Sequence, residues 1–396
     1  MSNELTKKGS TLSAIFLITG CCIGAGMIGF PVMTATAGFI PSTIAMILCY
    51  LFAAGSGLLL LEATMWFDYK VNLISLSNFT LGKTGKAITW FFFLFLFYCL
   101  FVAYIDGGGQ IFANSLSSLF HLNVAREIGI ILCVAVIGAI TYLGTRTVSL
   151  VSRIFLVGLI ASFIFLIAFG IPSMQGDRLL HANWPAMIST IPILLICFGY
   201  QNLIPTLIDY LKKDLRTIRI AIFVGNLIPF CIYLIWNTVI LGILPEENTI
   251  NAASQSDMVT GLLQKAAESE SVIFFAQTFS FFAILTPFMT NTIAFVDFLK
   301  DGLNLSKYKV NHASILYGLV LVPPMLLTLF YPHLFLRALG LAGGFADVIL
   351  FGIMPVLIVW IGRYKKNMIG PYQAPGGKLF LLLIFLFSLG FLFIRN

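Results

Sequence analysis

The sequence predicts an all-α polytopic membrane protein, and its composition, its apolar segments and the placement of its charges all support that class. Of the 396 residues, 59% are hydrophobic and only 10% are charged. Soluble domains carry about 25% charged residues, so a soluble globular protein is excluded. No polar stretch between the apolar segments is long enough to fold as a separate domain. We therefore treat 1–396 as a single transmembrane domain.

Windows of about 20 apolar residues divide the chain into expected transmembrane helices. There are eleven, with limits 11–39, 41–67, 87–117, 127–144, 148–171, 186–210, 218–244, 271–299, 313–331, 334–362 and 378–395. A semi-polar segment, 72–85, precedes the third span and is expected to form an interfacial helix. The seven cysteines lie in apolar segments, which favours buried small residues over disulfides or metal ligands.

The order of basic residues along the chain predicts an orientation. With the N-terminus in the cytoplasm, most of the 23 Lys and Arg residues fall on the inner side, as expected for a plasma-membrane protein. In a Gram-negative bacterium this would be the inner membrane. The acidic segment 245–270 and the C-terminus then lie outside. The net charge of +7 reflects this orientation, and we expect no nucleic-acid partner.

The first span carries four glycines and a proline between Gly20 and Pro31, in the stretch GCCIGAGMIGFP. In hydrocarbon, an opened helical turn leaves N–H and C=O groups that protein, water or a ligand must pair. A broken span can offer a helix N-terminus to an anion and freed carbonyls to a cation. The same glycines also suit close helix packing, so this stretch alone leaves both interpretations open.

The sixth span has a second interruption, where Gly199, two amides and Pro205 fall within a short stretch after Phe198. Because five is an odd number, spans one and six run in opposite directions across the membrane. Interrupted spans at matching places in two inverted halves mark the binding site of secondary transporters. This pattern favours a first repeat over 11–171, a second over 186–362 and an extra helix at 378–395.

Three acidic residues lie at depth in expected spans, where a charge costs at least about 2.5 kcal/mol. Glu62 lies near the inner end of span two, Asp106 in span three and Asp347 in span ten. Each is expected to be paired, protonated or in contact with water. Asp106 is the sharpest functional candidate, because Tyr104 and three glycines surround it. A structural role as a cap for freed backbone is equally open for Asp106, and for Glu62 the structural interpretation leads.

Motifs along nearly the whole chain resemble the hydroxy/aromatic amino acid permeases, a bacterial branch of the amino acid–polyamine–organocation superfamily. They are Thr19 to Pro31, Ala103-Tyr104-Ile105-Asp106-Gly107, Phe198-Gly199-Tyr200, Asp297-Phe298-Leu299, Pro323-Pro324, Leu329-Phe330-Tyr331-Pro332, Ala338-Leu339-Gly340 and Gly376-Gly377. The tyrosine-specific permeases are the most similar, and the tryptophan permeases are the alternative. The resemblance implies a five-plus-five inverted-repeat, leucine-transporter-like fold with the substrate between the breaks in spans one and six.

The resemblance also implies which residues meet the backbone groups of the amino acid. From span one these are Cys22, Gly24, Ala25 and Gly26, from span six Cys197, Phe198, Gly199 and Tyr200, and from span three Tyr104. Two positions depart from the family pattern. Tyrosine permeases have Phe-Gly-His in place of Phe198-Gly199-Tyr200, and a small residue such as serine in place of Asp106. Both departures fall at the expected site, so substrate and coupling ion are not simply inherited.

We therefore expect a secondary active transporter that imports an aromatic amino acid, tyrosine first, by alternating access. Tryptophan, phenylalanine or a broader set of amino acids remain alternatives. A channel is the rival class, although the chain has no repeated filter motif. An enzyme is disfavoured, because the four histidines lie in loops away from any acidic partner at depth. The expected partners are the amino acid, a coupling ion and membrane lipid, with no cofactor and no metal.

Proton coupling is preferred over sodium coupling. Asp106 supplies a titratable group near the expected level of the site, with Glu62 as the second choice. A sodium site could draw on Thr286 and on the carbonyls of Gly20 and Ile23. Pro287, next to Thr286, offers no side-chain ligand, so a dehydrated Na⁺ would lack oxygen partners. The resemblance points the same way, since the family is proton-coupled.

Overall fold

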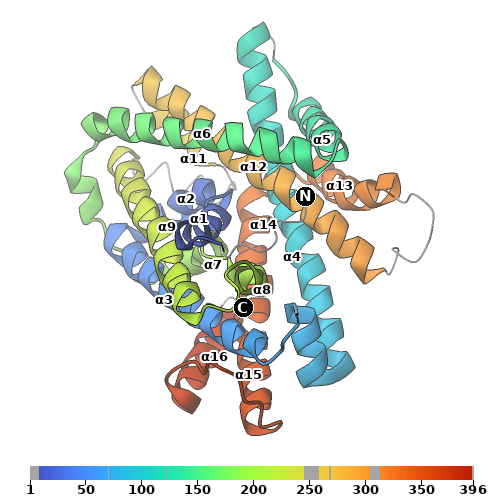
Figure 1. Ribbon diagram of the computed structural model, residues 1–396. Coiled ribbons are helices and arrows are strands. Elements are labelled where there is room, and N and C mark those ends of the chain that lie inside the picture. Colours follow the sequence, from blue (N-terminus) through green and yellow to red (C-terminus); the bar gives the residue numbers. More distant parts are fainter. Residues whose placement is uncertain are drawn as a thin grey trace.

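The computed structural model describes residues 9–69, 71–121, 123–244, 258–266, 269–303 and 313–394. In these residues the chain is a bundle of helices, which confirms the all-α class (Figure 1). Within the described part, eight helices are long and apolar enough to cross a membrane, or nine if a bent pair counts as one span. The two remaining expected spans are the shorter helices α5 (Arg126–Tyr142) and α16 (Gly377–Ile394), so the count of eleven is not confirmed. Most of the acidic segment 245–270 lies outside the described residues.

The other long helices follow the expected limits closely, apart from a kink at Gly82 in the helix α4 (Leu73–Phe120). They are α3 (Phe39–Met65), α4, α6 (Thr145–Gly170), α9 (Leu215–Ile243), α12 (Glu270–Gly302) and α13 (Ala313–Phe330), with the short helix α11 (Val259–Ala266) before α12. The expected helix within 72–85 is the first part of α4. Asn72 caps it by accepting a hydrogen bond from the Ser75 amide at 2.9 Å. Gly82, with φ of +72°, then turns the chain into the long apolar part of the helix.

Both expected interruptions are present. The first span consists of α1 (Thr11–Cys22) and α2 (Gly26–Ala37), which are bent by 59° at the break between them. The sixth span consists of α7 (Met187–Cys197) and α8 (Ile204–Tyr210), separated by residues 198–200 and a 3₁₀ turn over Gln201–Leu203. Each break contains a glycine, Gly24 in the first and Gly199 in the second, whereas Pro31 lies inside α2 and Pro205 in the first turn of α8.

A third irregular span was not anticipated. The expected continuous helix 334–362 is α14 (Phe335–Leu341), a π-helical stretch η6 (Ala342–Ile353) and α15 (Met354–Tyr364). The η6 backbone lies directly against α7, since a Cβ on Gly343 would fall 1.7 Å from the Pro192 carbonyl oxygen. π-Helical turns are uncommon and are frequent at functional sites.

The interrupted spans lie in the interior of the bundle. In Figure 1, α1, α2 and α7 lie between α3 and α9 on one side and α4, α12 and α14 on the other. The outer helix α6 exposes many large apolar side chains, among them Ile154, Val157 and Ile164. That distribution suits a protein surrounded by lipid, with its backbone irregularities shielded at the centre.

Candidate substrate and coupling site

The two interrupted helices meet at their breaks. A Cβ on Gly26 would lie 2.6 Å from Cys197 Sγ, so only a glycine lets α2 begin this close to the end of α7. The Cys21 thiol donates to the Gly199 carbonyl across 3.5 Å. Residues from opposite halves of the chain therefore form one local structure.

The backbone at this junction has the polarity that an amino-acid ligand requires. The helices α1 and α7 both end here, so their last carbonyls favour a cation. The helix α2 begins here, and the Met27 and Ile28 amides already bond back to Gly24 and Ala25 at 2.9 and 3.1 Å. The preceding amides, those of Ala25 and Gly26, lie at the positive end of α2, which favours an anion. The junction can thus bind a carboxylate at the start of α2 and an ammonium group at the ends of α1 and α7.

Tyr233 of α9 joins the ends of the two half-helices, and sequence reasoning missed it. Its hydroxyl lies 2.6 Å from the Cys22 carbonyl and 3.0 Å from the Cys197 carbonyl, so one O–H is shared between two helix ends. One turn further, the Trp236 indole donates to the Met27 carbonyl at 2.8 Å. The available signal was a run of buried side chains with polar atoms in span seven, but no pattern tied them to the breaks.

Two aromatic residues that the resemblance placed at the site are packed inside the protein. The Tyr200 hydroxyl donates to the Ala53 carbonyl at 3.0 Å, and its ring lies against Gly57 of α3. The Phe198 ring lies edge-on to the Tyr233 ring, with the two centroids 5.5 Å apart. Phe30 packs edge-on against the same tyrosine, with centroids 5.3 Å apart. Both side chains hold the second break against α3 and α9.

Tyr104 and Thr286 lie on the other side of the first break. Asn291 of α12 donates to the Tyr104 hydroxyl at 2.9 Å. Pro287 lies 3.6 Å from where a Cβ on Gly24 would be, which places this part of α12 against the break. The Thr286 hydroxyl is buried and has no hydrogen-bond partner among the described residues. It is therefore available to a ligand or an ion.

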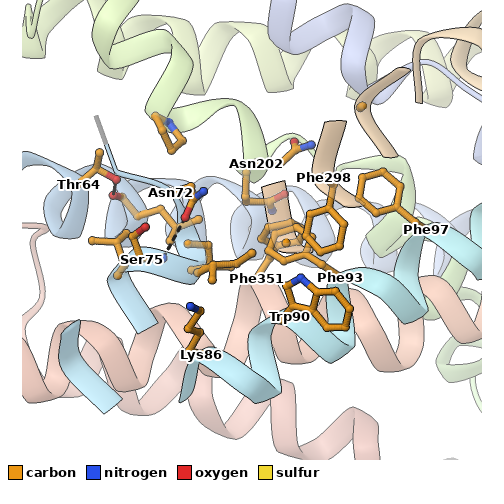
Figure 2. A pocket seen from close by; sticks show the side chains of 18 of the residues that line it. Thr64, Asn72, Ser75, Lys86, Trp90, Phe93, Phe97, Asn202, Phe298 and Phe351 are labelled. Carbon is orange, nitrogen blue, oxygen red and sulfur yellow. Dashed lines mark hydrogen bonds between the residues drawn. The ribbon is translucent and has the colours of Figure 1, made fainter. Parts of the chain in front are cut away.

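A cavity of about 460 Å³ lies beside the second break (Figure 2). Gln201 and Asn202, directly after the break, contribute to its wall. Figure 2 shows aromatic side chains gathered at one end and polar ones at the other. The aromatic end has Trp90, Phe93, Phe97, Phe298 and Phe351, and the polar end has Thr64, Asn72, Ser75 and Lys86.

None of the nine residues expected to bind substrate is among the described residues that line this cavity. Two of the lining residues nevertheless lie on helices that also carry residues of the expected site. On α4 the wall residue Phe97 is seven residues before Tyr104, and on α12 the wall residue Ala294 is eight residues after Thr286. Side chains at these spacings share one face of a helix. Phe97 and Ala294 thus lie on the same faces of α4 and α12 as Tyr104 and Thr286.

Two of the three acids at depth are paired. Glu62 accepts hydrogen bonds from both ends of the Arg363 guanidinium, with Nε at 2.6 Å, and from the Ala374 amide at 2.7 Å. Asp106 accepts from Arg126 Nη2 at 2.5 Å and from the Phe335 amide at 2.9 Å. The coupling role expected for Asp106 and Glu62 stays a prediction, and the structure gives both residues a structural role.

Asp347 is different. Its side chain is buried in η6, and neither carboxyl oxygen has a hydrogen-bond partner among the described residues. A Cβ on Gly199 would lie 3.6 Å from Asp347 Oδ1, which places the acid beside the second break. The sequence placed this residue at depth but gave no reason to connect it with the site.

The fold and the junction define a helical membrane protein whose two interrupted spans meet in its interior. This chain belongs to the tryptophan/tyrosine permease family, whose family model matches residues 7–394. The resemblance read from the motifs is therefore confirmed. The family match and the apolar helices together support an integral membrane protein.

Individual relatives match over almost their entire length. The chain is 28% identical over 383 residues to the tyrosine-specific transport system 1 of Haemophilus influenzae, covering 94% of this chain and 93% of that protein. It is 28% identical over 399 residues to the tryptophan-specific transport protein of the same species, covering 97% and 94%. It is also 24% identical over 381 residues to glutamine transporter 2 of Aliivibrio fischeri, covering 94% and 96%. These relatives are transport proteins and not enzymes.

Proposed function

We propose that this protein imports an aromatic amino acid, tyrosine first, by proton symport and alternating access. The observation that carries the proposal is the meeting of the two breaks, with Gly26 against Cys197 and Cys21 bonded to the Gly199 carbonyl. Relatives named for tyrosine and tryptophan transport support an aromatic substrate.

The substrate carboxylate binds at the start of α2, where Ala25 and Gly26 present their amides. The ammonium group binds at the carbonyl ends of α1 and α7. The ring then points away from Tyr233, which already occupies the far side of the junction, and toward Tyr104 and the aromatic wall of α4. Stacking on those rings supplies the preference for an aromatic side chain.

The N-terminus is cytoplasmic and the C-terminus lies outside, in the plasma membrane or the inner membrane of a Gram-negative bacterium. In that orientation the polar end of the cavity, with Lys86, Asn72 and Ser75, faces the cytoplasm. The conformation is then the one from which substrate leaves to the inside. Reporter fusions test this: a fusion at Asn251 reports the outer side and one at Lys366 the cytoplasm, and the reverse at either place contradicts the orientation.

Labelled tyrosine uptake in a transport-deficient host tests the substrate. Unlabelled tyrosine, tryptophan and phenylalanine are expected to compete, in that order of preference, whereas the other seventeen amino acids are not. Absence of tyrosine uptake by protein that reaches the membrane contradicts the proposal. Strong competition by glutamine would instead favour the broader specificity that the Aliivibrio fischeri relative suggests.

Sodium coupling is the second candidate, because the buried Thr286 hydroxyl, near the first break, has no hydrogen-bond partner among the described residues. Replacing sodium by choline separates the two ions. We expect uptake to be unchanged in choline and to collapse with a protonophore. Loss of uptake in choline, with the protonophore ineffective, would assign the coupling to sodium and to Thr286.

A further inference from the structure

We propose that Asp347 carries the coupling proton, and that it is in its neutral, protonated form in this conformation. The inference rests on the proposed proton symport and adds to it the residue through which the proton moves. Its starting point is a contrast within one bundle: three acids are buried alike, and only this one has no partner in the described structure.

The first step is the cost of a buried charge. Asp347 is 1% exposed, and neither of its oxygens receives a hydrogen bond from the described residues. An ionised carboxylate in such surroundings costs far more than a neutral one, because the side chain is shielded from the solvent and no described cation pairs with it. Binding a proton removes that cost. The neutral acid is thus the form that this packing accepts.

Second, the surroundings of the Asp347 side chain supply no positive charge in the described part of the chain. Among the described residues, the ionisable groups close enough to interact electrostatically with Asp347 are thiols, namely Cys21 and Cys22 of α1, Cys49 of α3 and Cys197 of α7. Thiols supply no positive charge. Other ionisable groups on the helices packed against η6 are Tyr50 and Glu62 of α3, Lys83, Lys86, Tyr98, Cys99, Tyr104 and Asp106 of α4, Arg337 of α14, Arg363 and Tyr364 of α15, and Lys378 of α16. None of these forms a hydrogen bond with Asp347.

The third step is position. Asp347 lies beside Gly199, whose carbonyl accepts from Cys21, so the acid is next to the junction of the two breaks. It also lies inside the π-helical stretch η6, which packs on α7 through Gly343. A change in the angle of α7 must therefore alter the surroundings of Asp347. Alternating access requires such a change at the interrupted helices.

The paired acids are poorly suited to this role. Protonating Glu62 or Asp106 would leave Arg363 or Arg126 without its counter-charge inside the protein. That rearrangement costs several kcal/mol for a buried pair. Protonating Asp347 leaves no cation of the described structure without its counter-charge. The proton therefore binds with least cost at Asp347.

The cycle that follows balances one proton per turn. In the outward-facing form, Asp347 meets water, takes one proton from the outer solution and becomes neutral. The neutral acid permits the packing seen here. The inward-opening conformation seen here still holds the neutral acid. When the junction next rearranges, water reaches the carboxyl and the proton leaves to the cytoplasm. The ionised acid then needs water, and its return to the outward-facing form completes the turn.

The test uses purified full-length protein in lipid vesicles and an Asp347→Asn variant, whose amide imitates the neutral acid. We expect this variant to exchange tyrosine across the membrane at a rate within about twofold of wild type, a difference of about 0.4 kcal/mol in the barrier. It should fail to accumulate tyrosine above equilibrium when a proton gradient is imposed. Asp347→Glu should recover accumulation. Asp106→Asn, matched in chemistry, should still accumulate tyrosine per molecule inserted.

Two results overturn the assignment. Accumulation by Asp347→Asn equal to wild type would place the proton elsewhere. Loss of both exchange and tyrosine binding, in variant protein present at normal amounts, would make Asp347 a ligand for the substrate ammonium group instead. If the asparagine variant does not reach the membrane, Asp347→Glu carries the test, because a replacement acid must keep the coupling.

A second readout needs no substrate. Infrared spectra recorded at neutral pH should show a carboxylic-acid C=O band in the wild type that is absent in Asp347→Asn and shifted in Asp347→Glu. A missing band in the wild type overturns the inference even if tyrosine is transported. A band that is present while tyrosine uptake is absent would contradict the proposed function and leave the protonated Asp347 supported.

Discussion

Glu62 and Asp106 each accept hydrogen bonds from an arginine and a backbone amide, whereas Asp347, buried to the same degree, accepts none from the described residues. The paired acids fasten segments that are far apart in the sequence. Glu62 joins α3 to α15 and to the chain at Ala374, and Asp106 joins α4 to α5 and to the start of α14. The Asp347 carboxyl joins no two segments in the described part of the chain, and it lies beside the second break.

The difference indicates a division of labour. A buried ion pair holds its two helices in one arrangement, because separating the charges costs several kcal/mol. An unpaired acid imposes no such restraint, and its energy depends on whether water reaches it. The ion pairs of Glu62 and Asp106 thus hold their helices in one arrangement. The acid that responds to protons, Asp347, lies at the junction of the two breaks. Substitutions at the two kinds of acid should therefore differ in the size of their effect on stability.

The largest effect is expected for Arg363→Met. The Arg363 side chain is only 5% exposed, and its loss leaves Glu62 ionised in the interior. We expect the free energy of unfolding to fall by about 3–5 kcal/mol, measured by thermal unfolding in detergent and by the amount in the membrane. Adding Glu62→Gln to the same chain should restore much of the loss. A single variant as stable as the wild type would mean that this pair does not hold α3 to α15.

A smaller effect is expected for Arg126→Met. Its side chain is 19% exposed, so water can partly replace the guanidinium next to Asp106. The Thr328 carbonyl also loses a donor at 3.0 Å. We expect a loss of about 1–3 kcal/mol in the same unfolding measurement. A loss larger than that of Arg363→Met would reverse the ranking of the two pairs.

The smallest effect is expected for Asp347→Asn. The amide is close in size to the neutral acid, and the described structure offers the acid no cation to lose. We expect the free energy of unfolding to change by less than about 1 kcal/mol, the net value of one hydrogen bond. A loss as large as that of Arg363→Met would show that Asp347 is ionised and paired, and the contrast between the acids would fail.

The sequence predicted the irregular spans where backbone chemistry decides the outcome. Glycines cluster between Gly20 and Pro31, and glycine, amides and proline between Gly199 and Pro205, so both breaks could be located approximately from residue types. The breaks themselves fall at Gly24 and Gly199. The π-helical stretch of span ten is not predicted by the sequence, since Gly343 and Gly344 resemble ordinary packing positions. The geometry of this stretch depends on its contact with α7, and a contact between distant segments cannot be seen in the sequence.

The partners of the acids could not be predicted for the same reason. Arg363 is 301 residues away from Glu62, and only the folded bundle brings them together. Tyr200 shows the limit of resemblance, since its position in a motif suggested the site while its hydroxyl bonds to α3. Tyr233 shows the converse, because nothing in its local sequence connects it with the two helix ends that it joins.

The central claim is that the substrate lies between the two breaks, and a graded pair of substitutions at Gly24 tests it most directly. A Cβ at Gly24 meets Pro287 at 3.6 Å, an ordinary contact, so Gly24→Ala should be tolerated. Gly24→Leu and Gly199→Leu fill the space assigned to the backbone groups of the substrate. Gly318→Leu is the control, because a Cβ there meets nothing within 4 Å.

The measurement is labelled tyrosine uptake, normalised to the amount of each variant in the membrane. We expect Gly24→Ala and Gly318→Leu to transport at near wild-type rates, and Gly24→Leu and Gly199→Leu to lose at least about 100-fold, which corresponds to about 2.7 kcal/mol. Wild-type uptake by both leucine variants at the breaks would place the substrate elsewhere in the protein.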